Sequence, residues 1–195
     1  CKVAFESRQR NPTMQPSAYT GTAIALHWLI AALIFTTFPL GVYMNELPFS
    51  PTRVQLYSYH KWIGITIFLL AVMRVAWRMS HPAPPPVAGT PAWQRITAAA
   101  THHLLYLLVI LIPVSGWLMS SAKGVPTVWL GLVPLPDLVG KNEELGELLE
   151  EVHETLNFLL LLLVVLHLVG ALKHRFIDRD EVMARMLPFL GSRKP

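Results

Sequence analysis

The segment Val152–Leu168 reads VHETLNFLLLLLVVLHL and has a histidine near each end of a largely apolar run. The fourteen residues that separate His153 from His167 make close to four turns of an α-helix. Both imidazoles therefore share one face and lie about 21 Å apart along the helix axis. The hydrocarbon core of a bilayer is about 30 Å thick. One helix thus offers an imidazole near each membrane surface, and ionisable residues inside a membrane are functional candidates.

The composition is that of an integral membrane protein. Of the 195 residues, 53% are hydrophobic and only 14% are charged, whereas about a quarter of the residues in a soluble domain are charged. The single cysteine, Cys1, excludes an internal disulfide framework, and the sequence has no Cys-x-x-Cys-His motif for covalent haem attachment. We expect lipid around the protein and no nucleic-acid partner.

Four segments are long and apolar enough to cross a bilayer as helices. The segment His81-Pro-Ala-Pro-Pro-Pro cannot continue a helix and reads as a connector. Val125–Gly140 mixes proline and glycine with apolar residues, which suggests an interfacial loop with Trp129 at headgroup level. The sequence therefore predicts an all-α, antiparallel, up-down-up-down four-helix membrane bundle. Its expected spans are about 23–44, 57–78, 98–120 and 152–173.

The expected domain organisation is one transmembrane domain over residues 20–190, with short polar flanks. Residues 1–19 are predicted to be a flexible N-terminal extension, and residues 191–195 a C-terminal tail. Residues 1–13 lack the apolar run and the small-residue cleavage site of a signal peptide.

Charge asymmetry predicts the orientation of the bundle. If both termini lie on one side, that side collects twelve of the sixteen Lys and Arg residues. The opposite side has only Arg53, Lys61, Lys123 and Lys141. By the positive-inside rule, both termini are expected in the cytoplasm.

This orientation converts sequence position into depth. His27 and His167 are expected near the cytoplasmic surface, and His60 and His153 near the opposite surface. A histidine on each of two facing helices is what a six-coordinate haem b needs. A tetrahedral zinc site would need four ligands at one depth, which neither pair supplies. Two axial imidazoles leave no open iron position, so the expected chemistry is electron transfer through two bis-histidine haems.

Several other side chains are candidates for contacts with the cofactors. Arg74 and Arg78 lie one turn apart at the cytoplasmic end of the second span, where they could anchor the helix or pair with haem propionates. Lys61, beside His60, could do the same at the other end. Gly64 and Gly170 could admit a flat macrocycle against the backbone, although small residues also serve ordinary helix contacts.

The remaining histidines are weaker candidates for iron ligands. His102 and His103 open the third span at the cytoplasmic level and could replace His27 or His167. A hydrogen bond to a propionate or a quinone carbonyl, or plain solvation, is the more favoured role for them. His81 and His174 fall outside the apolar spans, where solvent exposure is expected, although His174 could also bond a quinone.

The chain resembles the bacterial cytochrome b561 family of four-helix dihaem membrane proteins over about residues 20–190. The order and spacing of the matching segments are specific. These segments are Leu26-His27-Trp28, His60-Lys-Trp-Ile-Gly64 with Arg74 and Arg78, His81-Pro-Ala-Pro-Pro, His103-Leu-Leu-Tyr106, His153-Glu-Thr-Leu156, Leu166-His167, and Lys173-His174 with Arg185-Met-Leu-Pro188.

The resemblance implies that His27 and His167 hold one haem b and that His60 and His153 hold the other. It also implies electron transfer with a quinone such as ubiquinone, and some members of the family are superoxide:ubiquinone oxidoreductases. On the expected periplasmic side, four basic residues stand against eight acidic ones, a balance that attracts anions poorly. Local clustering of Lys61, Arg53 and Lys123 could still steer superoxide. The acidic stretch Glu143–Glu151 could instead receive a basic soluble redox partner.

Three alternatives stay open at this point. The chain could be the haem b membrane subunit of a larger dehydrogenase or hydrogenase complex. It could be a proton-coupled transporter that uses the histidines as a relay, or a purely structural membrane subunit. The last two predict a colourless protein and leave the paired depths of the histidines unexplained.

Overall fold

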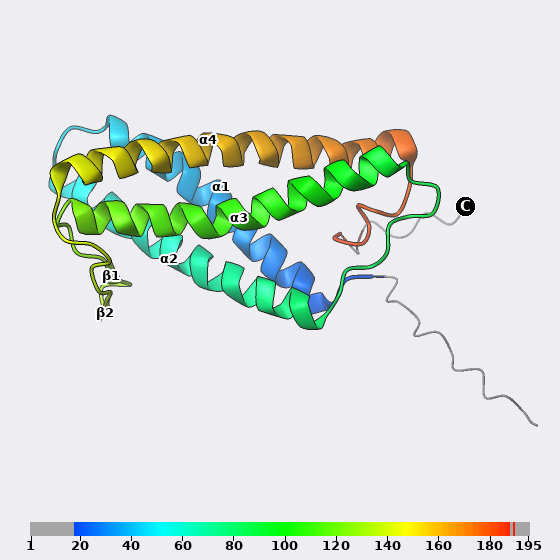
Figure 1. The fold of residues 1–195 in the computed structure, drawn as a ribbon, viewed down its shortest axis with the longest axis horizontal. Coiled ribbons are helices and arrows are strands. Elements are labelled where there is room, and N and C mark those ends of the chain that lie inside the picture. Colours follow the sequence, from blue (N-terminus) through cyan, green and yellow to red (C-terminus); the bar gives the residue numbers. More distant parts are fainter. Residues whose placement is uncertain (1–17, 188, 190–195) are drawn as a thin grey trace, which may run out of the picture.

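The computed structural model describes residues 18–187 and residue 189, and four long helices make up most of it (Figure 1). These helices are α1 (Gly21–Glu46), α2 (Pro51–Ser80), α3 (Ala92–Ala122) and α4 (Glu143–Lys173). Each expected span lies inside one of them, and all four are long and apolar enough to cross a membrane. The expected extension, apart from residues 18 and 19, and the expected tail lie outside the described residues.

Local sequence signals set the ends of these helices. The side chains of Thr20, Ser50 and Asn142 accept hydrogen bonds from backbone N–H groups three residues later, at 3.0–3.2 Å. Such N-caps satisfy donors that a helix leaves without intrahelical partners. Pro51 takes the first position of α2, where its missing N–H costs nothing. The helix α2 ends before the proline-rich connector, as expected for residues that precede proline.

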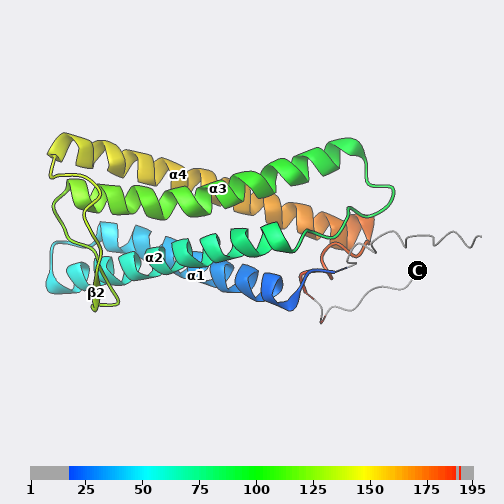
Figure 2. The ribbon, with the colours of Figure 1, turned by 60° about the horizontal axis from the view of Figure 1, so that its bottom comes forward.

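The helices form two hairpins that pack against each other. Within the hairpins, α1 packs against α2 and α3 packs against α4, while α2 also packs against α3. The backbone of α4, by contrast, makes at most marginal contact with α1 and α2 (Figure 2). Large apolar side chains such as Phe35, Phe158 and Leu162 are exposed, as expected of surfaces that face lipid. The predicted all-α four-helix membrane bundle is confirmed.

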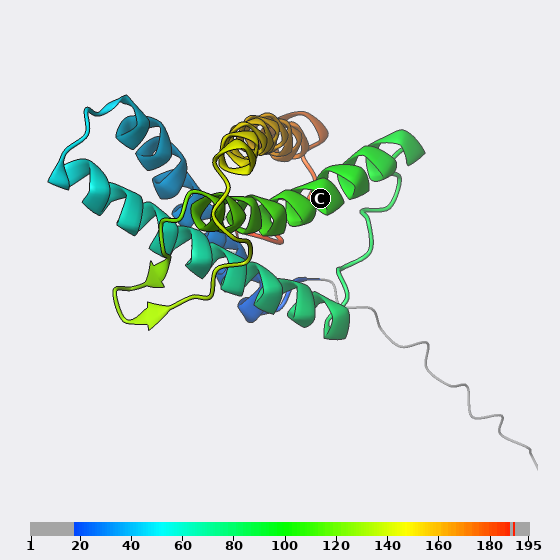
Figure 3. The same cartoon turned by 60° about the vertical axis from the view of Figure 1, so that its left-hand side comes forward.

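One end of the bundle, which we call the hairpin end, has a small antiparallel β-hairpin between α3 and α4 (Figure 3). Its strands are β1 (Val128–Trp129) and β2 (Val133–Pro134), where the sequence predicted only a loop. The indole of Trp62 in α2 donates to the Val128 carbonyl at 2.7 Å, and the indole of Trp129 donates to the Thr66 hydroxyl at 3.2 Å. These bonds hold the hairpin against α2.

The other end, which we call the terminal end, contains the starts of α1 and α3 and the ends of α2 and α4. Here α4 continues into a short π-helix, η1 (His174–Asp178). Arg179 has a left-handed backbone conformation with φ of 55°, which turns the chain back toward the bundle. The Trp28 indole then donates to the Met186 carbonyl at 2.9 Å, so the segment after η1 packs onto α1.

Candidate functional site

Two pairs of imidazoles converge inside the bundle, and each pair includes one histidine of α4. At the hairpin end, the ring centres of His60 in α2 and His153 in α4 lie 6.3 Å apart. At the terminal end, the ring centres of His27 in α1 and His167 in α4 lie 6.2 Å apart. The two interplanar angles, 76° and 70°, are also similar. Each pair thus faces across the gap between α4 and either α1 or α2.

This spacing fits one metal ion held between two imidazoles. A metal–imidazole bond is about 2 Å long, and a ring centre lies about 1 Å beyond each nitrogen, which places two axial ring centres about 6 Å apart. Imidazoles in direct hydrogen-bonding or stacking contact would lie closer together. The separation of the helices and the separation of the rings therefore both suit a flat macrocycle with an iron at its centre.

A cleft adjoins the hairpin-end pair. All four helices contribute to its wall, which is apolar apart from the two histidines, one threonine and one asparagine. An apolar cavity with a few convergent polar groups is the usual form of a cofactor site. The lining residues are Ile34, Thr37, Phe38, His60, Gly64, Ile67, Val109, Ile112, Pro113, His153, Asn157 and Leu160.

Hydrogen bonds to Nδ1 fix the ring orientations of the hairpin-end pair. The Nδ1 atom of His60 lies 3.1 Å from the Thr37 hydroxyl of α1. The Nδ1 atom of His153 lies 3.0 Å from the Ser115 hydroxyl and 3.1 Å from the Ile112 carbonyl of α3. Where Nδ1–H is donated to an acceptor such as the Ile112 carbonyl, Nε2 is left unprotonated, which is the form that ligates a metal.

Two glycines make room for the same imidazoles. A Cβ atom on Gly41 of α1 would lie 3.1 Å from Cε1 of His60, and a Cβ atom on Gly116 of α3 would lie 3.1 Å from Cε1 of His153. Any larger residue at either position would press on the imidazole. At Gly64 and Gly170, which the sequence suggested as contact points for a macrocycle, an added Cβ would meet no protein atom within 4 Å.

The terminal-end pair has a third imidazole beside it. The ring centre of His102 in α3 lies 5.2 Å from that of His167, in an edge-to-face arrangement. The Nδ1 atoms of His102 and His103 each lie 2.7 Å from the backbone carbonyl four residues earlier in α3. His102 is thus close enough to influence this pair.

Arg74 and Arg78, two of the three cationic candidates, make contacts at the terminal end. Arg74 is buried, donates to the Ala23 carbonyl at 2.5 Å, and lies over the ring of Tyr106. Arg78 donates to the His81 carbonyl at 3.1 Å and lies over the Tyr19 ring.

At the hairpin end, the Lys61 ammonium lies 3.4 Å and 3.5 Å from the carbonyl oxygens of Val125 and Pro126. Lys123 forms an ion pair with Glu150. Lys61 therefore keeps its cationic charge free of a carboxylate contact within the described part of the chain.

The expectation that His174 is solvent-exposed is wrong. Its side chain is only 18% exposed and contacts the carboxylate of Asp180 at 2.6 Å. His81 is also partly buried, because its ring stacks on Trp77 with a centroid distance of 4.1 Å.

The sequence reasoning missed Thr37, Gly41, Ser115 and Gly116, although one signal for the glycines was present. The fourteen-residue interval between His153 and His167 recurs between His27 and Gly41, between His60 and Arg74, and between His102 and Gly116. This interval connects the two histidine levels in every helix. Each glycine therefore lies at the depth of an imidazole on a neighbouring helix.

Comparisons with known proteins agree with this geometry. The family described as prokaryotic cytochrome b561 matches residues 18–189. The chain is 34% identical to cytochrome b561 homolog 2 of Escherichia coli strain K12, over 90% of this chain and 94% of the relative. It is 26% identical to the probable superoxide oxidase CybB of Yersinia pestis, over 87% and 96%, and 27% identical to cytochrome b562 of Cereibacter sphaeroides, over 89% and 97%. The chain therefore belongs to the prokaryotic cytochrome b561 family and is a membrane-embedded b-type cytochrome of electron transfer.

Proposed function

We propose that the protein holds two haem b groups and passes electrons through them across the bacterial inner membrane. His27 and His167 would ligate one iron, and His60 and His153 the other. The observation that carries this proposal is that each end of the bundle has two facing imidazoles. Their ring centres lie 6.2 Å apart at the terminal end and 6.3 Å apart at the hairpin end. Family membership supports haem b as the group that occupies these sites.

The residues around each pair suit electron transfer rather than chemistry on a bound substrate. Two axial imidazoles fill both free positions of a haem iron, and haem then supplies a one-electron carrier. Thr37 and Ser115 hold the hairpin-end imidazoles in place, and the apolar cleft wall excludes water. A rigid, dry site changes little when its charge changes, which favours rapid electron transfer.

Cations at both ends would pair with the haem propionates. Arg74 and Arg78 would serve the haem at the terminal end, and Lys61 the haem at the hairpin end. The buried guanidinium of Arg74 uses one nitrogen for the Ala23 carbonyl and retains further donors for a carboxylate.

The proposed orientation places the terminal end in the cytoplasm and the hairpin end in the periplasm. It rests on the twelve basic residues on the terminal side against four on the other. His102, His103 and His174 all lie near the terminal end, where they could bond the carbonyl oxygens of a quinone such as ubiquinone.

Superoxide is the electron donor that we propose at the hairpin end. The relative named probable superoxide oxidase supports this choice. Lys61 supports it as well, because its ammonium at the mouth of the bundle forms no ion pair within the described residues, although Asp137 lies close enough to attract it. Superoxide would give one electron and leave as molecular oxygen, and quinone would collect two electrons and two protons.

A vesicle experiment tests both the donor and the orientation. Superoxide generated enzymatically outside right-side-out spheroplasts is expected to reduce the haems, because the hairpin end then faces the superoxide. The same generator outside inverted vesicles is expected to reduce them much more slowly. Haem absorbance gives the rate, and superoxide dismutase outside the membrane is the control. Equal rates in both preparations would contradict this orientation. Reduction that persists when dismutase is added would contradict superoxide as the donor.

The hydrogen bond that the Ser115 hydroxyl accepts from His153 is expected to tune the redox potential of one haem. Acceptors on Nδ1–H make a ligating imidazole more basic and stabilise the ferric state. Ser115→Ala should therefore raise the potential of the hairpin-end haem, and Thr37→Val should do the same through His60. A spectroelectrochemical titration is expected to show one haem shifted and the other unchanged. Two unchanged potentials would contradict this role.

A haem b subunit of a larger complex would share these ligands but would need a docked dehydrogenase. Purification of a dihaem protein that responds to superoxide or quinol without any other subunit would distinguish the two.

A further inference from the structure

His174 continues the line of imidazoles on α4. It follows His167 by seven residues, which is close to two helical turns. It therefore lies on nearly the same helix face, about 10 Å closer to the end of the bundle.

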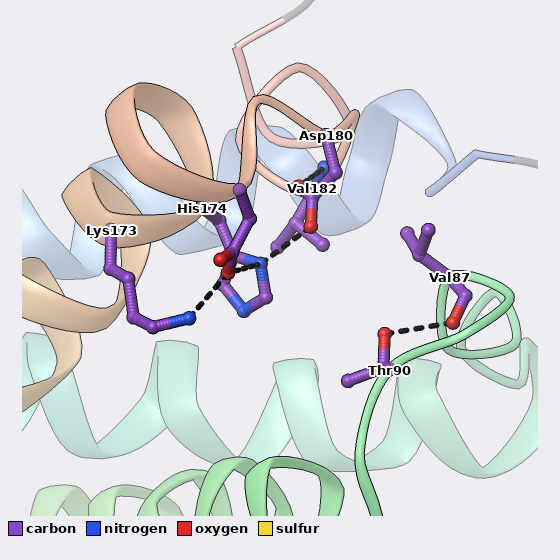
Figure 4. A network of polar contacts seen from close by, with 7 residues as sticks. Val87, Thr90, Lys173, His174, Asp180 and Val182 are labelled. Atoms are coloured by element: carbon purple, nitrogen blue, oxygen red, sulfur yellow. Dashed lines mark hydrogen bonds and ion pairs between the residues drawn. The ribbon is translucent and has the colours of Figure 1, made fainter.

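A short contact with Asp180 fixes the His174 imidazole (Figure 4). Nδ1 of His174 lies 2.6 Å from Oδ2 of Asp180, and Oδ1 of Asp180 accepts from the Val182 backbone N–H at 2.9 Å. The two side chains are only 18% and 16% exposed. Because η1 and the left-handed Arg179 turn the chain back, two residues six positions apart meet at the end of the helix.

This geometry leaves the second ring nitrogen available. Asp180 engages Nδ1, and Nε2 lies on the opposite edge of the ring (Figure 4). Nε2 has no hydrogen-bond partner among residues 18–187. When the imidazole carries both of its protons, Nδ1–H is donated to Asp180 and Nε2–H can be donated to a ligand.

The charges around this pair suit a proton site better than a metal site. The donor atoms of His174, Asp178 and Asp180 lie within 4.8 Å of one another, as they would around a metal ion. The Lys173 ammonium, however, already lies 2.6 Å from Asp178. Lys173 and a protonated His174 together balance both carboxylates, which removes the need for a divalent cation.

Two arginines at this end bond backbone carbonyls. Arg78 donates to the His81 carbonyl, and Arg185 donates to the Pro85 carbonyl at 2.6 Å. Asp178, at 3.3 Å from Nδ1, is the second carboxylate near the imidazole.

We propose that His174 delivers a proton to a quinone at the terminal end and that Asp180 positions it for this step. The inference rests on the proposed function and deepens it. Conversion of a quinone to a quinol needs two electrons, which arrive through the haems, and two protons. His174 gives a proton from Nε2 to one quinone oxygen and is reprotonated from the cytoplasmic solution, while Asp180 stays ionised. The second proton reaches the other oxygen from the solution.

Stopped-flow reoxidation of the purified, prereduced dihaem protein tests this step. A short-chain ubiquinone is one oxidant and ferricyanide, which accepts an electron without a proton, is the other. The variants are His174→Gln and Asp180→Asn. Asp178→Asn is a matched control, because it removes the same charge but keeps the 2.6 Å contact between His174 and Asp180. Haem content and spectra of each variant report on folding.

Both His174→Gln and Asp180→Asn are expected to slow reoxidation by ubiquinone by about tenfold or more, the scale of general acid catalysis. Their ferricyanide rates should match the wild type, and Asp178→Asn should behave nearly like the wild type with both oxidants. The quinone rate of the wild type should fall at high pH, and that pH dependence should be lost in His174→Gln.

Unchanged quinone rates in both variants, or equal slowing with both oxidants, would overturn the role of this pair while leaving the proposed function intact. A wild-type protein whose haems ubiquinone does not oxidise would instead refute the quinone in the proposed function.

Discussion

Replacement of His153 by alanine is expected to remove the haem at the hairpin end, and replacement of His167 by alanine should remove the haem at the terminal end. The ring centre of His153 lies 6.3 Å from that of its partner His60, and the ring centre of His167 lies 6.2 Å from that of its partner His27. Without this histidine, α4 would no longer hold the haem, which would then be bound by one imidazole from α1 or α2 alone. Each variant is therefore expected to retain one haem per chain instead of two.

The pyridine haemochrome assay measures this stoichiometry, and reduced-minus-oxidised spectra show which haem remains. The retained haem in each variant shows that the bundle is folded, so each variant serves as the other's control. His103→Ala is a further control, because the ring of His103 belongs to neither imidazole pair. Two haems per chain in His153→Ala would refute that ligand assignment. Two haems in His167→Ala would refute the other, provided that removal of His102 as well still left both haems bound.

The terminal-end pair adds one specific question to this experiment. His102 lies 5.2 Å from His167, which makes it the candidate to replace a missing ligand. The single variant His27→Ala and the double variant His27→Ala with His102→Ala separate the two cases. Haem retained by the single variant and lost by the double variant would identify His102 as a substitute ligand.

The helices and the pairing of histidines by depth could be predicted because both depend on position along the chain. Hydropathy marks the spans, and an antiparallel topology makes depth a matter of counting residues from each membrane surface. His27 and His167 are far apart in sequence but equally deep, and the structure brings them together. The same count pairs His60 with His153.

Contacts that depend on helix rotation could not be predicted in the same way. The helix α1 is apolar on all sides, so no stripe of residues shows which face points into the bundle. The sequence therefore did not indicate that Thr37 and Gly41 contact His60. The position of His174 depends on the π-helical turn and on Arg179, neither of which has a reliable sequence signal.

Gly116→Val is expected to displace the His153 imidazole and abolish haem binding at the hairpin end. A Cβ at this position would already lie 3.1 Å from Cε1 and 3.3 Å from Nδ1 of His153, and valine adds two methyl groups beyond it. The imidazole has little freedom to retreat, because Ser115 and the Ile112 carbonyl hold its Nδ1 atom from the same helix. Overpacking of this kind is accommodated by shifted side chains and backbone.

A graded series makes the result specific. Gly116→Ala should retain the haem with an altered spectrum or potential, because a displacement of a few tenths of an ångström relieves its contact. Gly116→Val should retain only the terminal-end haem. Gly170→Ala, where an added Cβ meets no protein atom within 4 Å, should keep both haems. Haem stoichiometry and the spectrum of the remaining haem distinguish these outcomes. If Gly116→Val kept two haems with wild-type spectra, the His153 imidazole could not occupy the position that ligation requires, because that position and the valine side chain overlap.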